Sequence, residues 1–148
     1  MMQDLSLEQI AQQAQTLVQA ETAVVALAES EGETVYYAAA VGKHAAAIAG
    51  KRGDSATSGL CGTTFQEGQP VLVCQTRGDA RVRQDYVEAL GIETALAVPI
   101  YYNGQLLGAL MMLNRQDGRL FDTEAEQQLA TFASAIAPQI QQWISKLK

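Results

Sequence analysis

Three hydroxyl side chains, Ser58, Thr63 and Thr64, gather around a short segment that the sequence predicts to be helical, residues 59–66. Backbone amides at the N-terminus of such a helix could bind an anion or a carboxylate. The alternative is ordinary helix capping, which by itself would explain the presence of Ser58. All three residues are therefore candidates for ligand binding.

Positive charge is concentrated just before and within a second predicted helix, residues 81–90. Three of the ten basic residues of the chain lie there: Arg77, Arg81 and Arg83. Arginine can clamp an anionic ligand through two parallel hydrogen bonds, which makes Arg81 a further candidate. The alternative is a solvated helix end on which Asp79 and Asp85 pair with the arginines, since surface ion pairs are common and weak.

Two other candidate ligand residues are Tyr86, on the same predicted helix, and Thr94, at the start of the following strand. Successive side chains of a strand point to opposite faces of its sheet. Thr94 therefore shares one face with Leu96, and Ala95 shares the other with Ala97. Either face could line a pocket.

Cys61 and Cys74 are the two cysteines of the chain, too few for a disulfide framework. A redox pair would need two sulfurs within reach, one of them a thiolate with a low pKa. Cys61 lies near a helix N-terminus, which would lower its pKa. The alternative is that both cysteines are small core residues.

Other chemistry finds little support in the sequence. The single histidine, His44, cannot form a zinc site without several partners, and it lies in an alanine-rich segment poorly suited to a haem ligand. No Ser-His-Asp set, HExxH motif, paired-acid motif or phosphate loop is visible. We therefore expect no catalytic residue, no metal and no cofactor.

Composition limits the class of protein. The 148 residues are 48% apolar and 18% charged, with a net charge of −6, which indicates one globular domain spanning residues 1–148. This acidic surface would be a poor general partner for nucleic acid or anionic membranes. The sequence has no apolar run of the roughly 20 residues that a membrane helix requires, and no secretory signal, so a cytoplasmic location is expected.

The pattern of apolar residues and turn signals predicts the elements that must position these side chains. Helices are predicted over residues 7–20, 59–66, 81–90 and from 123 onward, and strands over residues 22–28, 34–39, 70–73, 94–101 and 106–113. Residues 40–57 read as a long connection with one helical turn near 44–48. The fold class is therefore α+β, with a mixed or antiparallel sheet of five or six strands, terminal helices on one face and short helices on the other.

Local signals mark several boundaries. Ser6 with Gln9 forms a capping box for the first helix, and Thr123 with Glu126 forms one for the last. Ser58 is the expected N-cap of the helix over residues 59–66. The pair at residues 103–104, Asn-Gly, is typical of a type I′ hairpin turn.

The last helix has two unusual features. Pro138 interrupts its apolar stripe and should kink it. Beyond the kink, Trp143 and Leu147 are apolar residues near the chain end. The terminal helices, residues 5–20 and 123–147, could therefore pair with copies of themselves in a homodimer. The alternative is that Trp143 packs on the first helix of its own domain.

As an ordered set, four segments resemble the GAF domain family. They are GLCGTTFQEGQPVLV (59–73), DAR (79–81), GIETALAVPIYYNGQLLGALMML (91–113) and FDTEAEQQLATFASAIA (121–137). The resemblance implies a mostly antiparallel sheet with helices on both faces, and a ligand pocket beneath the short-helix face. Members of the family bind cyclic nucleotides, bilins, haem, small metabolites or anions, and others only dimerise.

The subfamilies can be compared at matching positions. Bilin-binding members carry a Cys, often followed by His, where this chain has Asp85 and Tyr86. Free methionine sulfoxide reductases use three cysteines, whereas this chain has two. The cyclic-nucleotide signature is matched loosely at Asn114 and Phe121, but Ala125 replaces its Asp, and both matches are equally explained as structural residues.

The leading hypothesis is a small-molecule-binding sensory domain that acts as a homodimer, with an unidentified and possibly anionic ligand. One alternative is a divergent thiol-dependent free methionine sulfoxide reductase that uses Cys61 and Cys74. Another is a ligand-free dimerisation or partner-docking module. The sequence leaves open whether the chain is a whole protein or part of a larger sensor.

Overall fold

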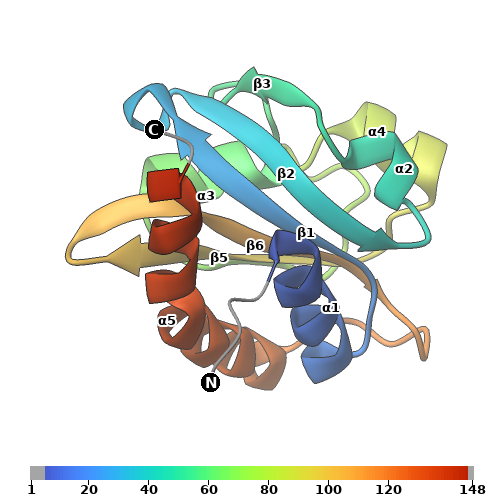
Figure 1. Ribbon diagram of the computed structural model, residues 1–148. Helices are drawn as coiled ribbons and strands as arrows, with labels where there is room; N and C mark the ends of the chain where they lie inside the picture. The colour runs from blue at the N-terminus through green and yellow to red at the C-terminus, as the bar shows by residue number, and fades with distance from the viewer. Residues whose placement is uncertain (1–5, 147–148) are drawn as a thin grey trace.

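A computed structural model describes residues 6–146 and shows an α+β fold, a six-stranded antiparallel sheet with helices on both faces (Figure 1). The elements are α1 (Leu7–Val18), β1 (Ala20–Glu29), the 3-10 turn η1 (Ser30–Gly32), β2 (Thr34–Gly42), α2 (Ala45–Ile48), β3 (Arg52–Asp54), α3 (Leu60–Glu67), β4 (Val71–Val73), α4 (Gln84–Leu90), β5 (Ala95–Tyr102), β6 (Gln105–Arg115) and α5 (Thr123–Lys146). The strand order is β3-β2-β1-β6-β5-β4, so the long strands β1 and β6 pair at the centre. The predicted fold class is confirmed.

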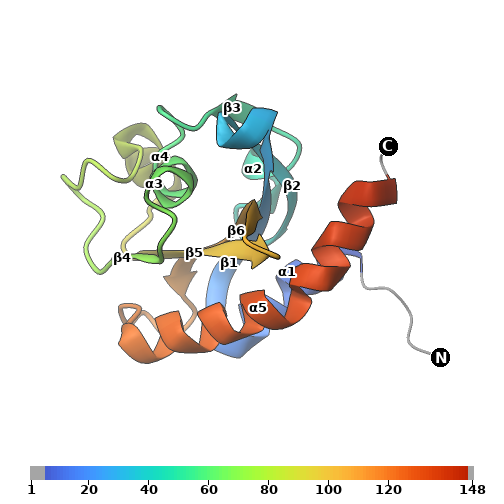
Figure 2. The same ribbon diagram turned by 90° about the vertical axis from the view of Figure 1, so that its left-hand side faces the viewer.

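The pleat of the strands separates two apolar cores. On β5, Leu96 and Val98 face the core beneath α1 and α5, while Ala95 and Ala97 face the core beneath α2, α3 and α4. Figure 2 shows the two layers, with the terminal helices on one side of the sheet and the short helices on the other. The second face, lined by small alanine side chains on β5, is the one that leaves room for a pocket.

The β5–β6 hairpin follows from its two turn residues. Asn103 and Gly104 have φ values of 52° and 78°, as a type I′ turn requires. The right-handed twist of such a turn matches that of the flanking strands. The predicted hairpin is confirmed, and its register pairs Tyr102 with Gln105.

The helix starts agree only in part with prediction. At α1 the Ser6–Gln9 capping box is present, with both reciprocal hydrogen bonds. At α5 the predicted Thr123–Glu126 box is wrong, because Asp122 accepts the hydrogen bond from the Ala125 amide at 2.9 Å. A carboxylate is also favoured there because it faces the positive end of the helix dipole.

Helix α5 continues through Pro138 to Lys146, and Figure 2 shows that its second half bends away from the line of the first. The bend agrees with the kink that proline imposes. Trp143 is half-buried and packs against the apolar core between the terminal helices and the sheet. Leu147, the other residue behind the dimer prediction, lies outside the described residues.

Residues 40–57 are more ordered than predicted. Strand β2 extends to Gly42, and β3 pairs with it through Thr34 and Asp54. The prediction missed β3 because a three-residue strand has no measurable period. Within residues 6–146, no helix combines the length and apolar character needed to cross a membrane.

Candidate functional site

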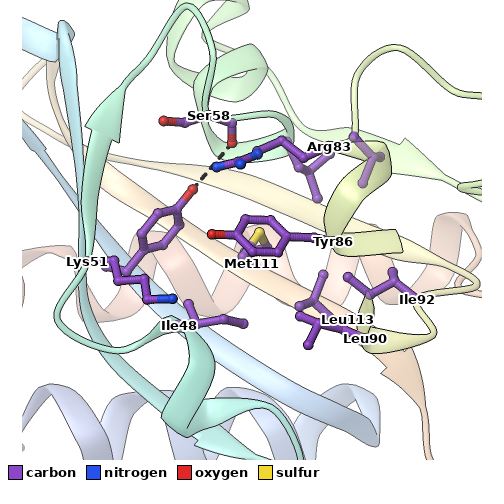
Figure 3. Close-up of a pocket in the computed structure, with 12 residues that line it drawn as sticks. Ile48, Lys51, Ser58, Arg83, Tyr86, Leu90, Ile92, Met111 and Leu113 are labelled. Carbon is purple, nitrogen blue, oxygen red and sulfur yellow. Dashed lines mark hydrogen bonds between the residues drawn. The ribbon is translucent and has the colours of Figure 1, made fainter. Parts of the chain in front are cut away.

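A pocket lies between the sheet and the layer formed by α2, α3 and α4 (Figure 3). Its apolar lining consists of Ile48, Leu60, Val82, Leu90, Ile92, Met111 and Leu113. Its polar lining is Tyr37, Lys51, Ser58, Arg83 and Tyr86. The cavity volume is about 40 Å³. A cavity of this volume holds about three water molecules. Pockets that bind drug-sized ligands are much larger, roughly 300–1,000 Å³.

Tyr37 reaches the pocket from β2, next to a register shift in the β1–β2 pairing. Its backbone is joined to the segment before β3, since Tyr37 donates to the Lys51 carbonyl at 2.9 Å and accepts from the Gly50 amide at 2.7 Å. These two bonds place Lys51 beside Tyr37. The Tyr37 hydroxyl donates to the Ser58 carbonyl at 3.3 Å, and burial raises its pKa, so it stays a neutral donor.

Arg83 and Tyr86 enter the pocket from the start of α4. The Arg83 guanidinium lies 4.3 Å from the centre of the Tyr86 ring, a cation–π contact. It also donates two hydrogen bonds to the Asp85 carboxylate, at 2.7 and 3.2 Å. Both partners of this ion pair are largely exposed, so it contributes little to stability but occupies the guanidinium.

Two of the predicted ligand residues, Ser58 and Tyr86, line this pocket. Ser58 is not the N-cap of α3, however. That position is Gly59, whose φ of 65° suits glycine, and the Ser58 hydroxyl donates instead to the Asp54 carbonyl at 2.6 Å. Ser58 thus ties the end of β3 to the start of α3.

The other four predicted ligand residues, Thr63, Thr64, Arg81 and Thr94, do not line this pocket. The hydroxyls of Thr63 and Thr64 donate to carbonyls one turn earlier in α3, at 3.0 and 2.9 Å. Thr63 borders a separate shallow depression, and Thr64 is fully buried. Arg81 precedes α4, which begins at Gln84 rather than at residue 81, and it pairs with Asp79 at 2.7 Å. This is the surface ion pair that the sequence offered as the alternative.

Thr94 is also a structural residue. It is buried just before β5, where its hydroxyl donates to the Val73 carbonyl at 3.2 Å and accepts from the Phe121 amide at 3.1 Å. The nearby Asn114, with φ of 60°, accepts from the Glu93 amide at 2.6 Å. Asn114 and Phe121, which loosely match the cyclic-nucleotide signature, therefore belong to the network that closes the last loop.

The cysteines do not form an evident redox site. Cys61 is fully buried, and burial raises its pKa to about 12, opposite to the shift expected from the start of α3. Its thiol contacts the Met111 sulfur at 3.5 Å. Cys74 is exposed at the end of β4. The expectation of a low pKa for Cys61 is wrong because desolvation outweighs the effect of a short helix.

The lone histidine is not part of the pocket lining. His44 precedes α2, where its backbone amide donates to the Thr22 hydroxyl at 3.2 Å. Across residues 6–146, no three His, Cys, Asp or Glu side chains lie close enough together to hold a metal ion.

Sequence reasoning did not propose Tyr37, Lys51 or Leu113 as lining residues of the pocket. The sequence could have predicted the orientation of Tyr37, because side chains alternate along a strand and Tyr37 therefore faces the other side of the sheet from Tyr36. No sequence pattern identifies Lys51, because its place in the pocket depends on backbone hydrogen bonds between residues 50–51 and Tyr37 of β2.

The fold and the pocket define a small α+β domain with a cavity beneath its short helices, and comparison with known proteins gives the family. The GAF domain model matches residues 4–140, so the chain belongs to the GAF domain family. No curated protein sequence matches the chain.

Several solved structures share the fold. The GAF domain of a phosphoenolpyruvate-protein phosphotransferase from Acinetobacter has a TM-score of 0.78 at 18% identity, covering 95% of this chain and 82% of that chain. The GAF-B domain of DevS from Mycobacterium smegmatis has a TM-score of 0.73 at 20% identity, covering 95% and 93%. A free methionine-R-sulfoxide reductase from Neisseria meningitidis has a TM-score of 0.74 at 18% identity, covering 91% and 75%. At these identities the likeness establishes the fold and not the activity.

Proposed function

We propose that this GAF domain is a sensory module that binds a small molecule in the pocket beneath α2 and α4. The observation that carries the proposal is the combination of an apolar floor with polar groups converging from separate elements. Tyr37, Lys51 and Arg83 come from β2, the segment before β3 and the start of α4. An apolar cavity with a few oriented polar groups is the usual form of a small-molecule site.

Screening a metabolite panel by thermal shift and native mass spectrometry tests this proposal. Leu90→Phe should reduce the cavity and weaken any hit by at least about tenfold, since its side chain lines the pocket and is half-buried. Leu120→Phe is the matched control, because Leu120 is 43% exposed and outside the lining. Failure of every compound to stabilise the protein would favour the ligand-free module instead. Compounds that bind Leu90→Phe as tightly as they bind the wild type would indicate a binding site outside this pocket.

We further propose that the terminal helices pair in a homodimer. Residues 9–20 and 127–145 contain none of the 26 charged residues of the chain, although they cover most of α1 and α5. Interfaces are depleted of charge at their centre, and two copies with a net charge of −6 would repel unless they met through uncharged faces. Leu17, 41% exposed, and the half-buried Phe132 border a shallow groove between these helices.

Native mass spectrometry and light scattering measure the number of chains. Leu17→Glu should shift a dimer to monomer by placing a charge in the contact. Leu120→Glu, the same change at an exposed site outside the helices, should leave it unchanged. A wild-type monomer at high micromolar concentration would contradict the dimer. A dimer unaffected by Leu17→Glu would contradict the interface.

A further inference from the structure

The charges around the pocket are unbalanced in a way that restricts its ligand. Within residues 6–146, the lining contains two cations, Lys51 and Arg83, and no acidic side chain. Arg83 is already engaged by Asp85 and by the Tyr86 ring. Among the described residues, the Lys51 ammonium has no carboxylate within ion-pair distance. One unpaired positive charge therefore stands at the pocket mouth.

The position of Lys51 suits an interaction with a bound molecule. Its side chain is exposed, but Figure 3 shows it extending from the edge of the pocket inward, with the ammonium near Ile48. Two backbone hydrogen bonds to Tyr37 hold the main chain of residues 50 and 51 in place, so the ammonium moves only by its own rotamers. A ligand that closes the mouth would shield the ammonium from water and strengthen the attraction between the two charges.

The rest of the lining sets the size and polarity of the ligand body. Seven apolar side chains form the floor and walls, and the cavity volume of about 40 Å³ admits only a compact group. A second negative charge would meet no second unpaired cation in the lining. A positively charged group would face Lys51 and Arg83 without an acidic partner, and burying an unpaired charge is costly.

We propose that the pocket selects a compact apolar monocarboxylate, a branched short-chain acid, whose carboxylate meets Lys51 while its apolar body enters the cavity. The Tyr37 hydroxyl, which donates to the Ser58 carbonyl at 3.3 Å, is a neutral donor of the same lining that would serve the second carboxylate oxygen. The Tyr86 ring and Met111 line the cavity that the apolar body would enter. This inference rests on the proposed function and names the chemistry of its ligand.

Calorimetric titration with matched probes at pH 7 tests the inference. Isobutyrate and isovalerate are the acids, isobutyramide and isovaleramide their neutral analogues, and isobutylamine and isopentylamine the cationic ones. Each acid should bind about five- to tenfold more tightly than its amide, as expected for a partly exposed charged contact, and the amines should not bind. The preference for the acid should shrink as salt is raised.

Substitution of the lysine separates charge from shape. Lys51→Gln should abolish the preference for acid over amide while leaving amide affinity within about twofold. Lys51→Arg should retain part of the preference. Lys43→Gln is the control, because Lys43 does not line this pocket.

The possible failures are distinguishable. Equal binding of acids and amides, or an unchanged preference in Lys51→Gln, would overturn the ligand class but leave a pocket that binds small molecules. If neutral or cationic compounds from the metabolite panel bind and the acids do not, the ligand class is again overturned while the small-molecule site remains. Absence of any hit that is sensitive to Leu90→Phe would overturn the proposed function itself.

Discussion

Thr94→Val tests whether Thr94 is structural, as its hydrogen bonds indicate, or part of a ligand site, as the sequence suggested. Valine keeps the size and branching of threonine but removes the hydroxyl that accepts from the Phe121 amide and donates to the Val73 carbonyl. The site is 1% exposed, so water cannot easily replace these bonds. A buried donor left unsatisfied costs about 1–3 kcal/mol, and we expect a loss of about 2 kcal/mol in the free energy of unfolding.

Urea unfolding followed by fluorescence of the single tryptophan, Trp143, measures this loss. With an m-value of about 2 kcal/mol/M, the midpoint should fall by about 1 M while the m-value stays constant. Thr94→Ser is the matched control, because it keeps both hydrogen bonds and loses one methyl group, at about 1 kcal/mol. Ligand affinity at the pocket should not change in either variant. A valine variant more stable than the serine variant, or one that changes affinity, would refute the reasoning.

Three further predictions concern stability and thiol reactivity. Gly62→Ala should destabilise the protein by about 2 kcal/mol or more in thermal unfolding, because the new Cβ would overlap the Ser55 carbonyl oxygen. Asn114→Gly should cost about 1–3 kcal/mol in urea unfolding by removing the acceptor of the Glu93 amide, and Asn114→Ala should cost more because of its φ of 60°. Iodoacetamide at pH 8 should modify Cys74 but not Cys61 in the native protein, since a pKa of about 12 leaves Cys61 almost entirely protonated.

Each of these has a control and a contrary outcome. Gly78→Ala is the control for Gly62→Ala, since a Cβ at Gly78 meets nothing within 4 Å, although its φ of 80° carries a cost of about 1 kcal/mol. Equal melting temperatures for the two variants would argue against the clash. An alanine variant of Asn114 as stable as the glycine variant would argue against backbone strain. Both thiols should react after unfolding in urea, and rapid native labelling of Cys61 would reopen the thiol-reductase hypothesis.

Prediction from sequence succeeded where the controlling interactions are local. Asn103 and Gly104 adopt the left-handed conformations of a type I′ turn, and Ser6 forms its reciprocal hydrogen bonds with Gln9, because these contacts span at most a few residues. The order of elements, with one apolar face on each terminal helix, was sufficient to indicate α+β class and the two-layer cover of the sheet. Strand β3 escaped prediction because it is defined by its partner β2 rather than by its own pattern.

For the candidate site, sequence reasoning identified polar residues but not their partners. Thr63, Thr64 and Arg81 look available in the sequence, yet each is satisfied by a neighbour within four positions. For Cys61 a local argument, the helix N-terminus, predicted a lower pKa, and burial reversed the shift. The state of a polar group depends on desolvation and on partners, and both come from packing.

The sequence by itself therefore determined the fold class, the hairpin and the family resemblance, since hydrophobic periodicity and turn preferences depend on residues that are close together in the chain. Only the tertiary structure decided what the pocket contains. Pairing of Tyr37 with residues 50 and 51 brings Lys51 to the mouth, and the pleat of β6 turns Met111 and Leu113 toward the short helices. These placements depend on contacts between segments far apart in the chain, which no local pattern encodes.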